Sequence, residues 1–160
     1  MKVIQQQLLI AGTILFLLGL LLGFALPGLA NPRMGMSAHA AAVQSGTALW
    51  ALGLMWQRLA LRPRWQRATE ALAVLSLYAL VAGLLLAALW GASRAAPIAG
   101  VGFHSSPAHE AVVSALMIGG SVALVVAIGL VLWGLLAWKV TEQGQQTRRS
   151  KKVRGGWTAR

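Results

Sequence analysis

The chain has 160 residues, 58% hydrophobic and 11% charged, with a mean hydropathy of +0.69; soluble domains carry roughly 25% charge, so this composition excludes a large soluble core and indicates one transmembrane domain. The net charge of +11 does not indicate nucleic-acid binding, because the basic residues flank apolar segments, where Lys and Arg set topology and contact anionic lipid. The absence of cysteine excludes disulfides, thiolate nucleophiles and cysteine-bound iron–sulfur clusters.

The first apolar run, residues 8–26, predicts a membrane-spanning helix, since it is uncharged and long enough to cross a hydrocarbon core of roughly 30 Å. Gly19 and Gly23 form a GxxxG pattern that lets a second helix approach closely. Lys2, the apolar run and the small residues up to Ala30 also resemble a signal peptide. The run is long for such a peptide, so we expect it to remain as the first helix.

The stretch of residues 31–46, NPRMGMSAHAAAVQSG, follows the first run. Its second half begins a second predicted helix at residues 38–56. Ser37 is the expected N-cap of that helix. Ala38, Ala42 and Gly46 follow at four-residue spacing, which predicts a face of small residues for tight helix packing.

The third and fourth predicted helices cover residues 70–90 and 111–138. A connection with four arginines and Pro63 precedes the third, and a Gly- and Pro-containing loop separates the two. We expect the PAHE run from Pro107 to begin the fourth helix, with Glu110 suiting the first turn. The fold class is therefore all-α, a four-helix transmembrane bundle over residues 1–140. Residues 141–160 are too polar to build a core and predict a disordered basic cytoplasmic tail.

The basic residues predict the orientation in the membrane. Twelve of them lie at the N-terminus, in the second connection and from Lys139 onward, whereas only Arg33 and Arg94 lie on the other side. The positive-inside rule then predicts both termini in the cytoplasm.

His39 is the strongest candidate for chemistry, because it is the one histidine near the interior of a predicted membrane helix. A neutral imidazole is a good ligand for haem iron or another transition metal. Alternatively, His39 sits at the membrane interface and merely hydrogen-bonds a loop carbonyl. No other predicted helix offers a histidine, so a haem here would have a single histidine ligand and an open position.

Other polar residues offer weaker signals. Tyr78, the only tyrosine, could donate a hydrogen bond to a substrate oxygen, or could simply join two helices. Ser45 follows His39 by six residues, less than two helical turns, and so lies near the same side of the helix. It could orient a substrate or pack between helices. His104 and His109 do not have the spacing of a zinc motif, and three acidic residues are too few for paired carboxylates.

Residues 29–39, LANPRMGMSAH, resemble the first-loop signature of bacterial hydroxylaminobenzene mutases. Three further segments carry the same resemblance: residues 89–91, the loop from Pro97 to Gly100 with His104 and Glu110, and residues 130–135. The likeness runs from the first predicted helix to the end of the fourth. That family is similar to styrene oxide isomerase, another small four-helix membrane enzyme.

The resemblance implies an isomerase that rearranges an aryl hydroxylamine to an aminophenol, or an aryl epoxide to an aldehyde. It implies a homotrimer with haem b between neighbouring subunits and a histidine ligand at the position of His39. The iron would act as a Lewis acid on a small aromatic substrate, with Ser45 and Tyr78 lining the pocket. Such catalysis needs few protein acids, which suits this chain.

Two positions depart from the family pattern. Relatives usually carry Asn at the places of Ser45 and Leu80, where its side chain lines the pocket. These differences favour an alternative in which the chain is a non-catalytic protein that binds haem or a small ligand. A third reading is a structural or transport-related protein, but no acid lies deep in a predicted helix to couple protons.

Overall fold

The computed structural model describes residues 2–156, with side chains described as far as residue 139. Its four α-helices are α1 (Lys2–Ala25), α2 (Pro32–Met55), α3 (Pro63–Trp90) and α4 (Pro107–Gly156). Short 3-10 turns, η1 (Leu26–Gly28) and η2 (Trp56–Arg58), follow α1 and α2. No strand occurs in the described part of the chain, so the predicted all-α, four-helix fold is confirmed.

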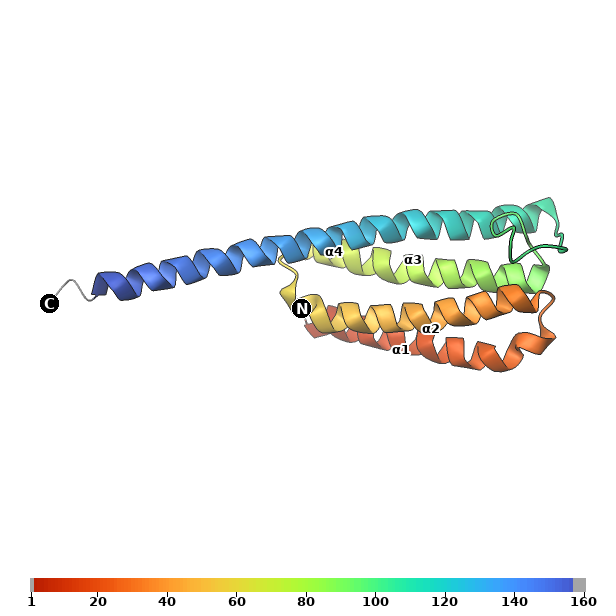
Figure 1. Ribbon diagram of the computed structural model, residues 1–160, viewed down its shortest axis with the longest axis horizontal. Helices are drawn as coiled ribbons and strands as arrows, with labels where there is room; N and C mark the ends of the chain where they lie inside the picture. Colours follow the sequence, from red (N-terminus) through yellow and green to blue (C-terminus); the bar gives the residue numbers. More distant parts are fainter. Residues whose placement is uncertain (1, 157–160) are drawn as a thin grey trace.

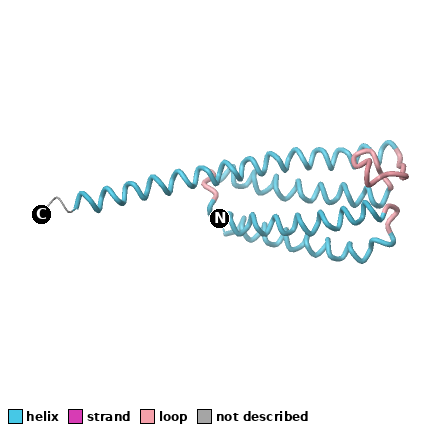
Figure 2. Tube along the Cα trace, viewed as in Figure 1, coloured by secondary structure: helices cyan, strands magenta, loops and turns pink. Residues whose placement is uncertain are grey.

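The helices form two antiparallel hairpins that lie side by side (Figure 1). One hairpin pairs α1 with α2, the other pairs α3 with α4, and α2 contacts α3 between them. The loops gather at the two ends of the bundle (Figure 2). The N-terminus and the α2–α3 connection share one end, from which α4 extends beyond the other helices.

α2 and α3 begin earlier than their apolar runs alone suggest. α2 begins at Pro32 because Asn31, not Ser37, is its N-cap: the Asn31 side chain accepts a hydrogen bond from the Met34 backbone N–H. The prediction for Ser37 is wrong, and its hydroxyl instead bonds the Arg33 carbonyl inside the helix. Pro63 likewise occupies the first turn of α3. Helices can therefore continue past the apolar run into polar sequence.

α4 begins at Pro107 with Glu110 in its first turn, which confirms the predicted start. It continues to Gly156, well into the basic segment 141–160. This segment is rich in Gln, Lys and Arg and lacks proline, so its composition permits a helix. The side chains of residues 140–156 and all of residues 157–160 lie outside the described residues.

Three helices are long and apolar enough to cross a membrane: α1 with η1, α3, and α4 as far as Lys139. α2 is as long as α1 but more polar, since it carries Arg33, His39, Gln44 and Ser45. Of these residues, Arg33 and Gln44 are exposed, Ser45 is buried, and His39 contacts α1. The apolar helices fit a membrane protein, and many of their large side chains are exposed on the outside of the bundle.

Glycines set the short distance between α1 and α2. A Cβ on Gly46 would lie 2.7 Å from the Gly12 carbonyl oxygen, and a Cβ on Gly19 would lie 2.9 Å from the Val43 backbone nitrogen. Ala38 and Ala42 are almost fully buried on the same side of α2. The predicted close approach at Gly19 and the predicted small-residue face of α2 are thus confirmed.

Two side chains fix the far end of the bundle. The buried Asn31 donates a hydrogen bond to the Ala99 carbonyl at 3.0 Å, besides capping α2. The Glu110 carboxylate accepts hydrogen bonds from the backbone N–H groups of Ser93 and Arg94 at 2.9 and 3.0 Å. The α3–α4 loop is therefore attached to the start of α2, eight residues before His39.

Candidate functional site

His39 lies on α2 where that helix faces the GxxxG segment of α1. Its Nδ1 is 2.7 Å from the Gly19 carbonyl oxygen, and its ring would contact a Cβ on Gly23 at 3.2 Å. The absence of side chains at Gly19 and Gly23 therefore makes room for the imidazole. The ring is half-buried between the two helices.

The hydrogen bond decides the chemistry of the imidazole. A carbonyl oxygen only accepts, so in neutral His39 the proton lies on Nδ1 and the lone pair lies on Nε2. Metal-binding histidines commonly show this arrangement, with the second ring nitrogen donating to a carbonyl or carboxylate. The sequence offers a loop carbonyl as the alternative to a ligand role, but the partner is the Gly19 carbonyl within α1. This contact is compatible with a ligand role.

The surroundings of His39 suit a haem better than a bare metal ion. No group of three or more His, Cys, Asp or Glu side chains occurs among the described residues, whereas zinc sites need at least three protein ligands. A haem iron needs only one axial protein ligand. Exposed apolar side chains flank His39 along both helices: Leu20, Phe24 and Met36. Such a surface fits the apolar faces of a porphyrin.

Tyr78 lies on α3 and reaches α1, where its hydroxyl donates a hydrogen bond to the Ala11 carbonyl at 2.8 Å. It lines an apolar groove of about 380 Å³ between these helices. The other lining residues are Gln7, Ile10, Ala11, Ile14, Val74 and Leu75. An aromatic molecule entering from the lipid could occupy this groove next to the phenol hydroxyl.

The three predicted site residues do not share one cluster within the described chain. Ala11 and Gly19, the partners of Tyr78 and His39, are eight residues apart on α1, which is about 12 Å along an α-helix. Ser45 is buried, with 8% of its surface exposed, next to the Gly46 contact with α1. One subunit therefore presents an imidazole and a phenol at different depths.

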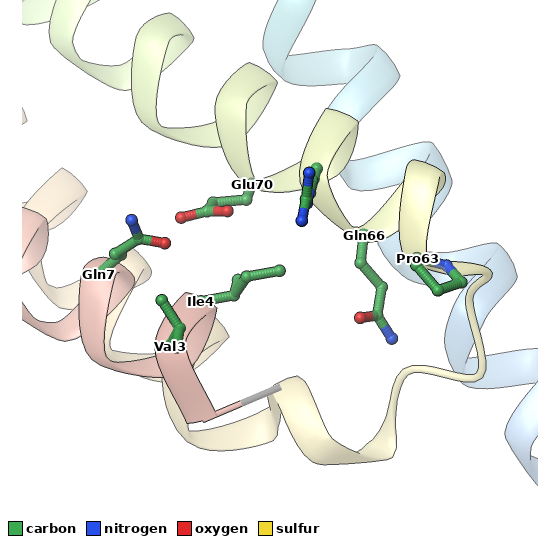
Figure 3. A pocket seen from close by; sticks show the side chains of 7 residues that line it. Val3, Ile4, Gln7, Pro63, Gln66 and Glu70 are labelled. Carbon is green, nitrogen blue, oxygen red and sulfur yellow. The ribbon is translucent and has the colours of Figure 1, made fainter.

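A second, polar cavity of about 630 Å³ lies between α1 and α3 at the N-terminal end (Figure 3). Glu70 and Gln7 project into it from opposite helices. Gln7 also lines the Tyr78 groove, so the two cavities adjoin there. Gln7 is not among the predicted site residues, although it belongs to the polar residues just before the first apolar run.

His109 has contacts within the protein. His109 stacks on Trp90 with ring centroids 4.1 Å apart, and its Nδ1 lies 3.2 Å from the Ser105 hydroxyl oxygen. Glu110 holds the loop backbone. These groups order the α3–α4 loop, and within the described residues they form no metal cluster with His104.

Comparison with known proteins gives the chain a family context. The family model of styrene oxide isomerase matches residues 4–136. The chain is 44% identical over 133 residues to hydroxylaminobenzene mutase HabB of Ectopseudomonas oleovorans, covering 82% of this chain and 81% of HabB. It is 41% identical to HabA of the same organism, again over 82% of this chain, and covers 98% of HabA. No solved structure shows significant similarity to it.

Proposed function

Because the chain belongs to the styrene oxide isomerase family, and is accordingly an isomerase or mutase, we propose that it rearranges an aryl hydroxylamine to an aminophenol. We choose the aryl hydroxylamine as substrate because the two mutase relatives are each more than 40% identical to this chain over most of its length. The second candidate reaction converts an aryl epoxide to an aldehyde, because the matching family is that of styrene oxide isomerase. Both reactions are intramolecular, so no external oxidant or reductant is consumed.

We further propose haem b as the cofactor, and His39 Nε2 would hold its iron. The hydrogen bond from Nδ1 to the Gly19 carbonyl supports this role, because it leaves Nε2 unprotonated and holds the ring plane. When bound, the iron would supply a Lewis acid for the nitrogen or oxygen lone pair of the substrate. His39 supplies the ligand, and Gly23 leaves space for its ring.

The other residues act on the substrate's polar end. The Tyr78 hydroxyl would exchange the Ala11 carbonyl for the leaving oxygen and donate it a hydrogen bond. Ser45 would offer a second hydroxyl from α2. The apolar groove beside Tyr78 would exclude water and admit aryl compounds that partition into the bilayer.

The proposed assembly is a homotrimer in the bacterial inner membrane, with both termini in the cytoplasm. The exposed apolar faces of α1 and α4 fit contact with lipid. Tyr78 and His39 contact α1 at Ala11 and Gly19, eight residues apart, so one subunit does not bring the two groups together. This separation supports a site completed by a neighbouring subunit. The basic residues at the N-terminal end support the orientation.

The test is the visible absorption spectrum of the detergent-purified protein, oxidised and reduced, together with turnover of hydroxylaminobenzene. We expect a Soret band and aminophenol formation in the wild type, and loss of both in His39→Ala. His109→Ala is the matched control, because its ring, at the start of α4, contacts Trp90 at the end of α3, and it should keep both. The absence of a Soret band after addition of haemin would overturn the cofactor proposal.

A non-catalytic haem-binding protein is the second candidate. Leu80, at a place where relatives usually carry Asn, packs against α4, with its Cγ 3.1 Å from where a Cβ on Gly120 would lie. An apolar side chain there offers no hydrogen bond to a substrate. A Soret band that depends on His39, without turnover of hydroxylaminobenzene or styrene oxide, would favour this candidate.

A further inference from the structure

We propose that a cavity between the start of α3 and α4 binds the headgroup phosphate of an anionic phospholipid. The cavity has a volume of about 400 Å³ and lies at the N-terminal end of the bundle, separate from the Tyr78 groove. Its lining combines two arginines with two tryptophans and small apolar residues: Ala60, Leu61, Arg62, Arg64, Trp65, Trp133 and Ala137.

The backbone around this cavity is held in place. The Ala60 N–H donates to the Gly134 carbonyl of α4 at 3.1 Å, and the buried Gln66 side chain donates to the Leu61 carbonyl at 3.1 Å. Gly134 permits this approach, because a Cβ there would lie 2.9 Å from Leu61 Cγ. The connection therefore presents the two arginines at a defined position against α4.

The charge of the cavity selects an anion. Arg62 and Arg64 are exposed, and no carboxylate lines the cavity among the described residues. The Arg64 guanidinium carbon lies 5.6 Å from the centroid of the Trp65 ring, which keeps the arginine beside the cavity. Guanidinium groups bind phosphate oxygens in a bidentate manner, so two of them can hold one phosphodiester.

The depth of the cavity selects a lipid over a free anion. The apolar sequence of α4 ends at Trp138, just before Lys139, so Trp133 and Ala137 lie in its last turns, where phosphates of the bilayer are found. Trp133 packs edge-on against Trp65, with centroids 6.4 Å apart, and is half exposed. Leu132 and Leu136 beside it are exposed and can accept an acyl chain.

Native mass spectrometry of the full chain in non-ionic detergent tests this proposal, with phosphatidylglycerol and phosphatidylcholine as the lipids. We expect retention of phosphatidylglycerol and little of phosphatidylcholine. The Arg62→Gln/Arg64→Gln variant should weaken phosphatidylglycerol retention at least fivefold. The control Arg58→Gln/Arg67→Gln removes the same charge at the same end but from outside the cavity, and should change retention less than twofold.

Equal losses in the two double variants would overturn the proposal, because net charge alone would then explain binding. Displacement of the lipid by millimolar inorganic phosphate or by soluble glycerophosphoglycerol would also overturn it, by showing a site for free anions. Trp133→Leu provides a variant that keeps every charge, with Trp138→Leu as its control. Retention should fall about threefold only in the first, and no difference between the two would count against the cavity.

Discussion

His39 differs from the other two histidines in what its ring contacts. Its Nδ1 contacts a backbone carbonyl of α1, whereas the His109 ring, at the start of α4, stacks on Trp90 at the end of α3. A histidine whose Nδ1 proton is held by a carbonyl keeps Nε2 as a lone-pair donor. This single hydrogen bond is the residue-scale basis for proposing His39 as the haem ligand.

Tyr78→Phe separates a structural from a catalytic role of the phenol. The variant loses the hydrogen bond to the Ala11 carbonyl, so we expect a loss of about 1 kcal/mol in stability, measured as thermal unfolding in detergent. If the hydroxyl acts on the leaving oxygen, kcat should also fall by about 10²-fold or more.

Ser121→Ala is a suitable control for Tyr78→Phe, because its hydroxyl bonds only the Met117 carbonyl one turn away on α4. It should leave both stability and turnover nearly unchanged. A Tyr78→Phe enzyme with normal kcat and lowered thermal stability would restrict Tyr78 to joining α1 and α3.

At the scale of elements, the α1–α2 hairpin depends on small residues rather than on large apolar contacts. Gly12, Gly19 and Gly46 allow backbone to approach backbone, and this contact carries the Gly19 carbonyl to His39. In a bilayer, where apolar burial gives little drive for association, such close packing contributes much of the helix–helix attraction. Glycine packing and the proposed ligand geometry are therefore linked.

Gly46→Ala should destabilise the hairpin. The added Cβ would meet the Gly12 carbonyl oxygen and Phe16 Cβ, both at 2.7 Å, so the helices must separate. We expect the free energy of unfolding to fall by about 1 to 3 kcal/mol. Size-exclusion chromatography of heated samples measures the resulting decrease in thermal stability.

Gly119→Ala is the matched control for Gly46→Ala, because a Cβ at Gly119 would meet nothing within 4 Å. It should be neutral or slightly stabilising, as Ala favours helix. Equal unfolding temperatures for the two variants would contradict the packing account of the hairpin.

At the scale of the whole molecule, the bundle places its basic residues at one end. Lys2, the arginines of the α2–α3 connection and the extension of α4 lie at the N-terminal end, whereas Arg33 and Arg94 lie at the other (Figure 1). This asymmetry between the two ends is the basis of the proposed orientation, with both termini in the cytoplasm.

Single-cysteine labelling can test the orientation, because the chain contains no cysteine of its own. Val101→Cys, at the far end, should react with a membrane-impermeant maleimide in spheroplasts with an intact inner membrane. Gln57→Cys, at the N-terminal end, should react only after the membrane is permeabilised. The reverse labelling pattern would contradict cytoplasmic termini.

Length and apolarity predicted the four helices because a membrane-spanning backbone must satisfy its own hydrogen bonds, and a helix does so locally. The small-residue face of α2 was also visible, since four-residue spacing places Ala38, Ala42 and Gly46 on one side. The start of α2 was not predicted correctly, because Asn31 and Ser37 are both good N-caps and the choice between them depended on Pro32. Local rules thus predicted the elements better than their ends.

The sequence by itself determined that this protein is helical, apolar and poor in acids, because these properties depend on composition and short-range periodicity. Only the tertiary structure decided which histidine nitrogen is free, since Gly19 lies twenty residues from His39. It also decided that Asn31 holds Ala99 and that Arg62 shares a cavity with Trp133. Such contacts join residues far apart in the chain, and their geometry follows from helix packing, which no local pattern specifies.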